Sequence, residues 1–467
     1  MNNMLHLDNK KIFLSFIILI LTSLLFSGCA DSENGSNPFN GFLSSIGLKT
    51  NQQQEAESEE IIQDLKKTSV TTIETFPAEQ TPNAEKLTET PEPTPTIYKI
   101  ELWVPPVFDM DQNTNAGKAL ETIIDQYTKE NPNININVRV KAVSGDSSMI
   151  NTLTSANHIA KDVLPSVAFV SRSDMEIAVQ RNLLQPIDTS LFNDTSSWYD
   201  FAKQSASVDS VVYGIPVFGD GLVLTYKPSK IGPDLEDWHD ILSRGMPIGF
   251  APSSSTSMFG LFIYLSIGGK LTNDQGQPYL DQQKLVETLN FFLSGGQNGA
   301  FPPSIAQLVD QGQVWQRFND GTMSMIISQF SSFRHYQSAE IAVRTLPLAE
   351  GITEYPLIDT LNLVIVEDDP VVQPEAVRFA EYLSDLDIND MLSVSAGYLP
   401  VRKGDHSAWK SDAQFGTIQT MCESSTLAPN NQIINKLVPL INNAVVQVIK
   451  NQMNPENAAN EALSGLN

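Results

Sequence analysis

The sequence predicts an α/β protein with mostly parallel sheets, preceded by a long segment that forms no regular structure. Two observations carry this prediction. From residue 98 onward, short runs of alternating apolar residues are separated by longer segments in which apolar residues recur at helical spacing. Before that point, residues 30–97 contain no Trp and no Cys and are rich in Glu, Gln, Ser, Thr and Asn. Strands that alternate with helices favour parallel sheets with right-handed crossovers.

The first elements can be placed in order along the chain. Ile100, Leu102 and Val104 alternate as one face of a strand. A helix is predicted over 116–131, where apolar residues fall at Ala119, Leu120, Ile123, Ile124 and Tyr127, and Pro132 stops it. The second strand carries the alternating residues Ile134, Ile136, Val138 and Val140. A third, buried strand is predicted over Val163–Val170, whose composition is mostly apolar.

The first thirty residues read as an export signal. Two lysines at positions 10 and 11 precede the apolar run Ile12–Phe26, which is too short to span a bilayer comfortably. The small residues at 27 and 28 stand directly before Cys29, an arrangement that resembles the lipobox of bacterial lipoproteins, although Phe26 stands where that box usually has Leu. The resemblance implies cleavage of a signal peptide, residues 1–28, and a lipid anchor on Cys29 that holds the chain to the cell membrane outside the cytoplasm. An uncleaved anchor helix and a plain secretory signal are the alternatives.

Residues 29–97 are predicted to be a disordered, acidic and Pro-rich tether. Such a composition cannot bury enough apolar surface to offset the entropy of ordering. Pro91, Pro93 and Pro95 favour an extended polyproline geometry at the end of this tether.

Charge and cysteine content exclude several classes of function. The chain has 467 residues, with 29 Lys plus Arg against 54 Asp plus Glu, giving a formal charge of -25. This excess of negative charge disfavours binding to nucleic acid or to an anionic lipid surface. The two cysteines, Cys29 and Cys422, lie in different settings and predict no disulfide framework.

Several segments occur in an order that points to a known family. They are Leu102-Trp103 on the first strand, YTKENP at 127–132, LPSVAFV at 164–170 with RNLLQPID at 181–188, YGIPVFGDGLVLTYK at 213–227, FNDGTMSM at 318–325 and AGYLPVR at 396–402. Together they resemble the extracellular solute-binding proteins of ABC importers, carbohydrate type, the family that includes maltose-binding protein. The resemblance covers nearly all of the chain from Tyr98 to the C-terminus.

The resemblance implies a two-lobed periplasmic-binding-protein type II fold, in which hinge strands join two α/β lobes around a cleft. The N-lobe would comprise 98–219 and 347–397, and the C-lobe 220–346 and 398–467. The implied function is capture of a small solute, expected to be a carbohydrate, and its delivery to ABC permease subunits. The implied protein is a monomer that needs no cofactor or metal and is not an enzyme.

Carbohydrate recognition needs aromatic faces together with carboxylates, amides and hydroxyls, and the resemblance places such residues at the cleft. Trp103 and Asp109 lie in and after the first strand; the alternatives are a core tryptophan and an acid that caps the next helix. Ser171, Arg172 and Asp174 follow the third strand, where Ser173 or Asp174 could instead cap a helix over 174–180.

Asp220 matches the acid that follows the family's hinge strand and faces ligand, although an Asp beside Gly219 and Gly221 also suits a tight turn. Gln329 and Phe330 are further expected contacts, with core packing of Phe330 as the alternative. Many members of the family have a tryptophan where Ser331 aligns, so the specific sugar is left open.

Other chemistries lack their local signatures. The histidines, at positions 6, 158, 239, 335 and 406, form no metal-ligand motif, and no nucleophile elbow or phosphate-binding loop occurs. A secreted glycosidase remains an alternative, because paired carboxylates leave no motif. A sensor lipoprotein of the same fold, which hands its ligand to a receptor and not to a permease, is the other.

Overall fold

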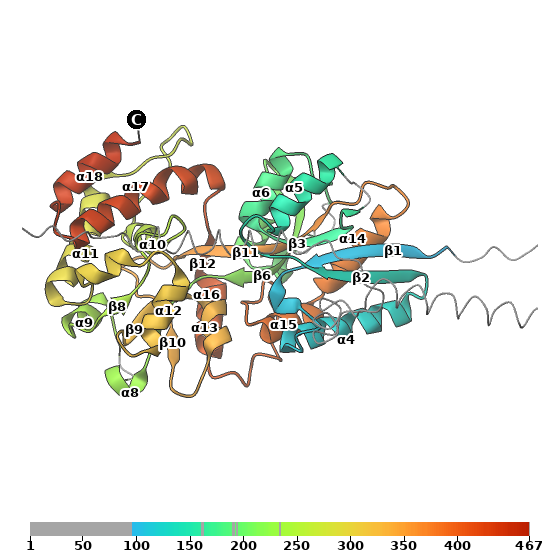
Figure 1. Cartoon of the computed structure of the whole chain (residues 1–467), viewed down its shortest axis with the longest axis horizontal. Coiled ribbons are helices and arrows are strands. Elements are labelled where there is room, and N and C mark those ends of the chain that lie inside the picture. The colour runs from blue at the N-terminus through green and yellow to red at the C-terminus, as the bar shows by residue number, and fades with distance from the viewer. Residues whose placement is uncertain (1–95, 160–162, 189–191, 193–194, 233–234, 467) are drawn as a thin grey trace, which may run out of the picture. The chain divides into compact units, whose positions relative to one another are not determined.

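The computed structural model describes residues 96–159, 163–188, 192, 195–232 and 235–466 (Figure 1). The predicted signal peptide, Cys29 and nearly all of the predicted tether lie outside the described residues. Within the part that is described, no helix is long and apolar enough to cross a membrane.

The larger of two main sheets has six strands in the order β12-β11-β3-β1-β2, with β6 also paired to β11. Its strands are β1 (Tyr98–Val104), β2 (Ile134–Val140), β3 (Val167–Ser171), β6 (Gly214–Asp220), β11 (Tyr355–Ile365) and β12 (Ser425–Leu427). β1, β2 and β3 run parallel, whereas β11 is antiparallel to both β3 and β6. The first two predicted strands are confirmed. The third begins at Val167 and not at Val163, because Pro165 has no N–H to give to a ladder.

The smaller sheet has four strands in the order β10-β7-β9-β8. They are β7 (Leu222–Tyr226), β8 (Ile248–Gly249), β9 (Met325–Gln329) and β10 (Ala342–Arg344). We call the larger sheet with its helices the first lobe and the smaller sheet with its helices the second lobe. A separate hairpin joins β4 (Ser207–Val208) to β5 (Val211–Val212).

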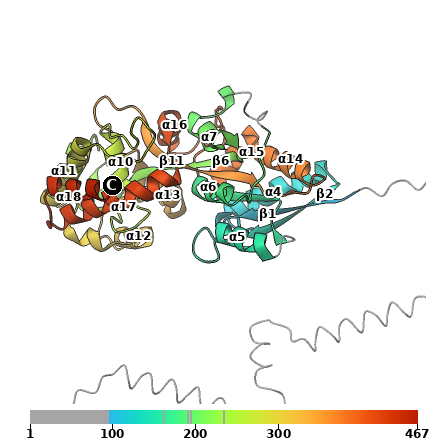
Figure 2. The same cartoon turned by 90° about the horizontal axis from the view of Figure 1, so that it is seen from above.

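Helices cover both sheets (Figures 1 and 2). Those of the first lobe are α4 (Asn115–Glu130), α5 (Met149–Ile159), α6 (Arg172–Gln180), α7 (Asp200–Ser205), α14 (Gln373–Leu383) and α15 (Leu386–Ala396). Those of the second lobe are α9 (Trp238–Ser243), α10 (Phe259–Ser266), α11 (Gln282–Asn298), α12 (Gln311–Asn319), α13 (Phe330–Tyr336), α17 (Asn431–Ile449) and α18 (Pro455–Ser464). The remaining helices are α8 (Pro228–Ile231) and α16 (Phe415–Ser424), with short 3-10 turns η1 (Pro106–Phe108), η4 (Thr195–Ser197) and η5 (Pro303–Gln307).

The helix predicted over 116–131 is α4, which begins at Asn115 and ends at Glu130. The Thr114 side chain accepts a hydrogen bond from the Gly117 N–H and so caps its first turn. Leu120, Ile123 and Tyr127 are buried, as the apolar spacing predicts.

The two faces of the first sheet contact different apolar clusters. Ile100 and Leu102 belong to the main core, whereas Trp103, on the opposite face of β1, packs in a smaller cluster with Met149 of α5 and Met175 of α6. Alternate residues of one strand point to opposite faces, so both sides of the sheet are covered. This burial makes the sheet a rigid base for side chains at its edges.

The chain passes between the lobes at Gly221, which joins β6 to β7. A Cβ atom at this position would lie 2.5 Å from the Ile358 Cδ1 atom and 3.0 Å from the Met421 Cε atom, so a larger residue would force the ends of both side chains to move. A register shift interrupts the β11–β12 pair beside the same crossing, and Leu357 has a φ of 68°. Such irregularities are typical of strands that bend.

Part of the C-terminal region pairs with the larger sheet. Leu399, within the range 398–467 predicted for the second lobe, bridges to Gly219, and β12 pairs with β11. The hydrogen-bond partners of such short segments leave no pattern in the sequence. α17 and α18 pack against α11 of the second lobe, and the exact residue boundaries of the lobes stay predictions.

Candidate ligand-binding site

Polar side chains gather where β3 and β6 end. Both strands are antiparallel to β11, so their carboxyl ends lie at the same edge of the sheet. Leu361 of β11 pairs with Ser171 on one side and with Phe218 on the other, and Asp359, two residues before it, pairs with Asp220. The carboxyl ends of strands are the edge at which open α/β sheets bind ligands.

Asp220 joins the first sheet to the second lobe. Its Oδ1 atom accepts hydrogen bonds from the Gly221 N–H at 3.0 Å and the Ser331 N–H at 3.1 Å, and its Oδ2 atom accepts one from the Ser331 hydroxyl at 2.5 Å. The Asp220 residue is 9% exposed. Burial raises the pKa of its carboxyl to about 7, although the bonds from Ser331 oppose that shift. Asp220 therefore fastens α13 to the end of β6 in this structure.

Asp359 and Tyr398 lie beside Asp220, and neither was predicted from the sequence. Burial raises the pKa of the Asp359 carboxyl to about 6; Arg172 lowers it, whereas Asp174 and Glu176 raise it further. Asp359 keeps intermediate exposure, and its Oδ1 atom accepts the Thr360 N–H at 2.8 Å.

Tyr398 also has intermediate exposure, and its ring stacks on Phe218 with a centroid distance of 5.4 Å. Burial, with Asp220 nearby, raises the pKa of the Tyr398 hydroxyl. A partly exposed carboxylate and a partly exposed aromatic ring thus lie together at the crossing. Asp359 interrupts a strand that is otherwise mostly apolar, and that interruption is the signal by which it could have been found.

Ser171, Arg172 and Asp174 lie at the start of α6. The Ser171 Oγ atom accepts the Asp174 N–H at 3.0 Å, so Ser171 is the helix cap and α6 begins earlier than predicted. Arg172 is bound by its own lobe, since its Nε atom lies 3.0 Å from Glu176 and its Nη1 donates to the Gln204 carbonyl at 3.2 Å. Burial raises the pKa of the Asp174 carboxyl, with a hydrogen bond from Ser171 opposing it.

A second contact between the lobes joins α6 to α17. The Ser173 hydroxyl donates to Asn431 Oδ1 at 2.7 Å, and Asn431 Nδ2 donates to the Ser173 carbonyl at 2.8 Å. The Asn431 N–H donates to Glu176 Oε2 at 2.7 Å. Residues on two helices far apart in the sequence therefore hold each other, a relationship that no local motif indicates.

Trp103 lies in the core, whereas Asp109 lies in the loop between β1 and α4. Trp103 is 1% exposed and lies in the core, which is the alternative that the sequence left open. The Lys141 Nζ atom lies 4.2 Å from its ring centroid. Asp109 Oδ1 accepts the Asp111 N–H at 3.0 Å, and it does not cap α4. The ring of Phe108 lies 5.3 Å from that of Phe169 and 5.6 Å from that of Phe218, so this loop folds over the ends of β3 and β6.

The second lobe contributes a cavity of about 150 Å³ at the carboxyl ends of β8 and β9, which pair in parallel. Its lining is Leu222, Phe250, Ala251, Ser254, Thr256, Ser257, Met258, Phe259, Gln311, Ile327 and Gln329, none of which is charged. Asn442 of α17 holds the loop that carries the hydroxyls, because its Nδ2 donates to the carbonyls of Ser254 at 3.2 Å and Ser257 at 2.9 Å.

Gln329 and Phe330, adjacent in the chain, differ in what they can contact. Gln329 lines the cavity, and its Oε1 atom is buried without a hydrogen-bond partner among the described residues. Phe330 is fully buried beside Phe333 and Trp409, as its core alternative states. Of this pair, Gln329 has the acceptor atom that a ligand hydroxyl could satisfy.

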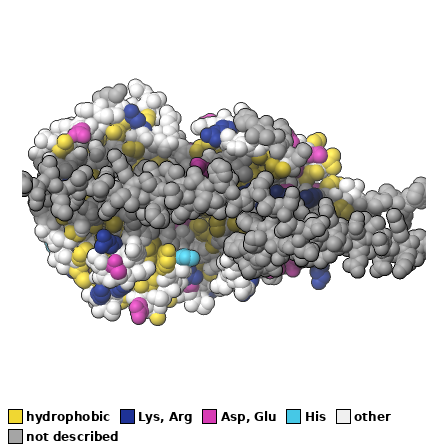
Figure 3. Space-filling view, in the orientation of Figure 1, with side chains coloured by type: hydrophobic (Ala, Val, Ile, Leu, Met, Phe, Trp, Pro, Cys, Tyr) yellow, Lys and Arg dark blue, Asp and Glu magenta, His cyan; other side chains and the backbone are white. Residues whose placement is uncertain are grey.

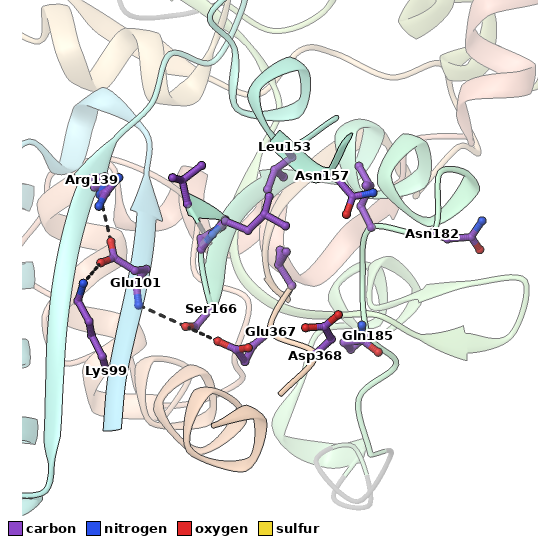
Figure 4. Close-up of a pocket in the computed structure, with 15 residues that line it drawn as sticks. Lys99, Glu101, Arg139, Leu153, Asn157, Ser166, Asn182, Gln185, Glu367 and Asp368 are labelled. Carbon is purple, nitrogen blue, oxygen red and sulfur yellow. Dashed lines mark hydrogen bonds and ion pairs between the residues drawn. The ribbon is translucent and has the colours of Figure 1, made fainter. Parts of the chain in front are cut away.

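A separate pocket of about 500 Å³ lies at the opposite edge of the first sheet (Figure 4). Its polar groups bind one another: Glu101 contacts Lys99 at 2.9 Å and Arg139 at 3.1 Å, and the Ser166 hydroxyl donates to Glu367 at 3.0 Å. Burial acts to raise the pKa of Glu101, but bonds from Lys99 and Asn137 and the charge of Arg139 outweigh it, so that pKa lies below its ordinary value. None of the predicted site residues lines this pocket.

Charged side chains of both signs are spread over the face shown in Figure 3. On the face in Figure 3, where it is not grey, acidic and basic side chains stand scattered and no patch of either sign gathers. Within the described residues, no group of three or more His, Cys, Asp or Glu is arranged to hold a metal ion.

Comparison with known proteins identifies one matching family and many solved structures with a similar fold. Residues 122–417 match the family described as bacterial extracellular solute-binding protein. A maltodextrin binding protein from L. casei, solved without ligand, is similar with a TM-score of 0.63 and 14% identity over 79% of this chain and 98% of that one. The cyclic alpha-maltosyl-1,6-maltose binding protein of Arthrobacter globiformis gives 0.65 and 13% over 79% and 98%. A maltose-binding periplasmic protein of Listeria monocytogenes, in complex with maltose, gives 0.64 and 14% over 79% and 96%.

Proposed function

Because this chain belongs to the family of bacterial extracellular solute-binding proteins, we propose that it captures a carbohydrate between its two lobes and delivers it to the permease subunits of an ABC importer. It does so as a monomer and without changing the ligand chemically. Closure of the lobes around the sugar changes the surface that the permease meets, so that binding becomes a signal for transport.

The uncharged cavity of the second lobe carries this proposal. Its hydroxyl and amide groups can bond the hydroxyls of a sugar, and the partly exposed Met258 in its lining adds apolar surface. A cavity of about 150 Å³ is smaller than the roughly 300–1,000 Å³ of a typical ligand pocket. The first lobe therefore completes the site, with Asp174, Asp359 and Tyr398 as the groups at its edge.

The names of the similar proteins narrow the ligand class to be tested. Those proteins are called binders of maltodextrin, maltose and a cyclic maltose derivative. We take α-linked glucose oligomers as the first candidates for this chain. Calorimetric titration of the full chain with maltose and maltotriose is expected to give one site per chain, and chromatography is expected to return the sugar intact. Release of shorter sugars would support a glycosidase, and absence of heat for every sugar in a wider library would reject a carbohydrate ligand.

Membrane attachment is the second part of the proposal. The sequence before Cys29 supports cleavage and acylation there, and two or more acyl chains would hold the protein stably at the membrane. Replacing Cys29 with Ala is expected to move the protein from the membrane fraction to the soluble extracytoplasmic fraction. Cys422→Ala is the matched control, since that thiol is buried in the folded body. Equal membrane retention of both variants would contradict the lipid anchor.

A further inference from the structure

A groove beside the strand crossing is distinct from the ligand site described above. It has a volume of about 690 Å³ and is lined by parts of α7, β12, the end of α16 and the segments 353–354 and 403–404. None of its lining residues lines the cavity of the second lobe. Figure 2 shows α7 and α16 on one side of β6 and β11, with α6 and α17 on the other. We call this hollow the α7–β12 groove.

The groove borders both lobes. α7 belongs to the first lobe, where the Ser205 hydroxyl donates to Asn362 Oδ1 of β11 at 3.2 Å. The segment that leads into residues 353–354 rests on the second lobe, since the Ala349 N–H donates to the Ser266 carbonyl at 3.1 Å. β12 pairs with β11 between them through Ser425 and Tyr355. A molecule in the groove would contact elements of both.

One buried hydroxyl in the groove finds no hydrogen-bond partner in the part of the chain that the structure describes. Ser425 is 9% exposed, it lines the groove, and its Oγ atom has no hydrogen-bond partner among the described residues. A buried hydroxyl left unpaired costs about 1–3 kcal/mol, which a bound polar molecule recovers. Its neighbour Ser424 differs, because the Ser424 hydroxyl donates to the Thr420 carbonyl at 2.6 Å within its own helix.

The floor of the groove is held rigidly by a buried chain of hydrogen bonds. The Tyr199 hydroxyl lies 2.9 Å from His406 Nε2, and His406 Nδ1 lies 3.0 Å from Asp390 Oδ1. Tyr199, His406 and Asp390 are each less than 9% exposed. A floor fixed in this way loses little conformational entropy when a molecule binds on it.

The charges around the groove select among polar molecules. Asp200, Glu354 and Glu423 are exposed carboxylates in its lining, and Lys403 is the only basic residue there. Lys203 pairs with Asp200 at 2.7 Å, which leaves the carboxylates of Glu354 and Glu423 against Lys403. This excess favours a ligand that donates hydrogen bonds and repels one that carries negative charge.

We infer that the α7–β12 groove is a second binding site, for a small hydroxyl-rich solute without negative charge. Ser425 bonds one hydroxyl of that solute at the floor, and the carboxylates of Glu354 and Glu423 accept from others at the rim. This inference does not depend on which solute the main site carries.

Hydrogen exchange measured on the full chain with glucose, glucosamine and glucuronate tests this site, because the three probes share one ring and differ in charge. Glucose and glucosamine are expected to slow amide exchange within residues 199–204 and 422–426 by at least about threefold, and glucuronate is not. Ser425→Ala should abolish that protection and Ser424→Ala should keep it. Glu423→Arg should allow glucuronate to protect the same segments.

Protection at residues 250–259 reports the main site separately, so the two proposals can fail independently. Equal protection by all three probes, or protection that survives Ser425→Ala, would overturn the groove as a built site. No protection in 199–204 and 422–426 by any of the probes would overturn it as well.

Discussion

Asp220 and Asp359 lie directly opposite each other across the antiparallel pair of β6 and β11. Two carboxyl groups thus lie together where the chain passes from β6 of the first lobe to β7 of the second. Burial raises the pKa of Asp220 to about 7 and that of Asp359 to about 6. The charge of Asp359 also raises the pKa of Asp220, so the protonation of Asp220 depends on that of its neighbour.

The contribution of Asp220 to stability should therefore fall as pH rises through this window. An unfolded Asp has a pKa of roughly 4, so between that value and about 7 the Asp220 carboxyl binds more protons in the folded chain than in the unfolded one. The free energy of unfolding decreases with pH wherever that holds. Between about pH 4 and about pH 8, the wild type should lose about 3 kcal/mol or less of its unfolding free energy through Asp220. Asp220→Asn should not show this loss, as measured by urea unfolding. Parallel pH profiles for the two proteins would contradict the raised pKa.

Removing the partner of Asp220 should destabilise the protein in a pH-dependent way. Ser331→Ala deletes the hydroxyl that donates to Asp220 Oδ2, leaving a buried carboxylate with fewer donors. The expected loss is about 1.5–3 kcal/mol near pH 8 and roughly half of that near pH 4, where Asp220 is protonated. Ser332→Ala is the control and should change the unfolding free energy by less than about 0.5 kcal/mol. A loss that is the same at both pH values would show that the charge of Asp220 is not involved.

Gln329 should contribute to ligand affinity without contributing to stability. Its Oε1 atom has no partner in the described structure, so Gln329→Ala removes no bond from this acceptor. With ligand bound, the lost hydrogen bond should weaken affinity about 5- to 15-fold, equivalent to roughly 1–1.5 kcal/mol. Calorimetric titration measures the affinity, and thermal unfolding without ligand checks the fold. Gln316→Ala, at an exposed position of α12, should bind like the wild type. Unchanged affinity in Gln329→Ala would exclude Gln329 from the site.

Asn431 should hold the two lobes together. Asn431→Ala removes both side-chain hydrogen bonds to Ser173 while keeping the backbone bond to Glu176. We expect a loss of about 1–3 kcal/mol in the free energy of unfolding. We also expect faster amide exchange at the start of both α6 and α17. Asn435→Ala, on an exposed position of the same helix, should show neither effect. Faster exchange in α17 alone would mean that Asn431 stabilises its own helix and not the contact between lobes.

The elements that could be predicted from the sequence are those whose signal is local. The alternation at Ile100 and Leu102 and the helical spacing in α4 each reflect one buried face, which the sequence pattern records directly. The family resemblance predicted the two-lobed fold and brought Asp220 to attention. It did not reveal that Ser331 would bind that same carboxylate.

The residues that escaped prediction depend on pairing between distant parts of the chain. Asp359 meets Asp220 only because β11 inserts beside β6, and Asn431 meets Ser173 only because two helices of different lobes begin near each other. Trp103 illustrates the opposite problem: an aromatic residue at a strand end fits a ligand site and a core equally well, and its neighbours Met149 and Met175 decide for the core. Such outcomes follow from tertiary packing, which one sequence does not display.

The position of β11 also has a consequence for the order of synthesis. This strand pairs with β3, β6 and β12, yet in the chain it comes after all four strands of the smaller sheet. A ribosome must therefore have made residue 365 before the larger sheet can gain its central strand, and residue 427 before the last ladder can form. Pairings at such sequence separation form slowly. Until residue 427 has been made, the larger sheet consequently lacks its last strand, and the growing polypeptide cannot reach its final fold.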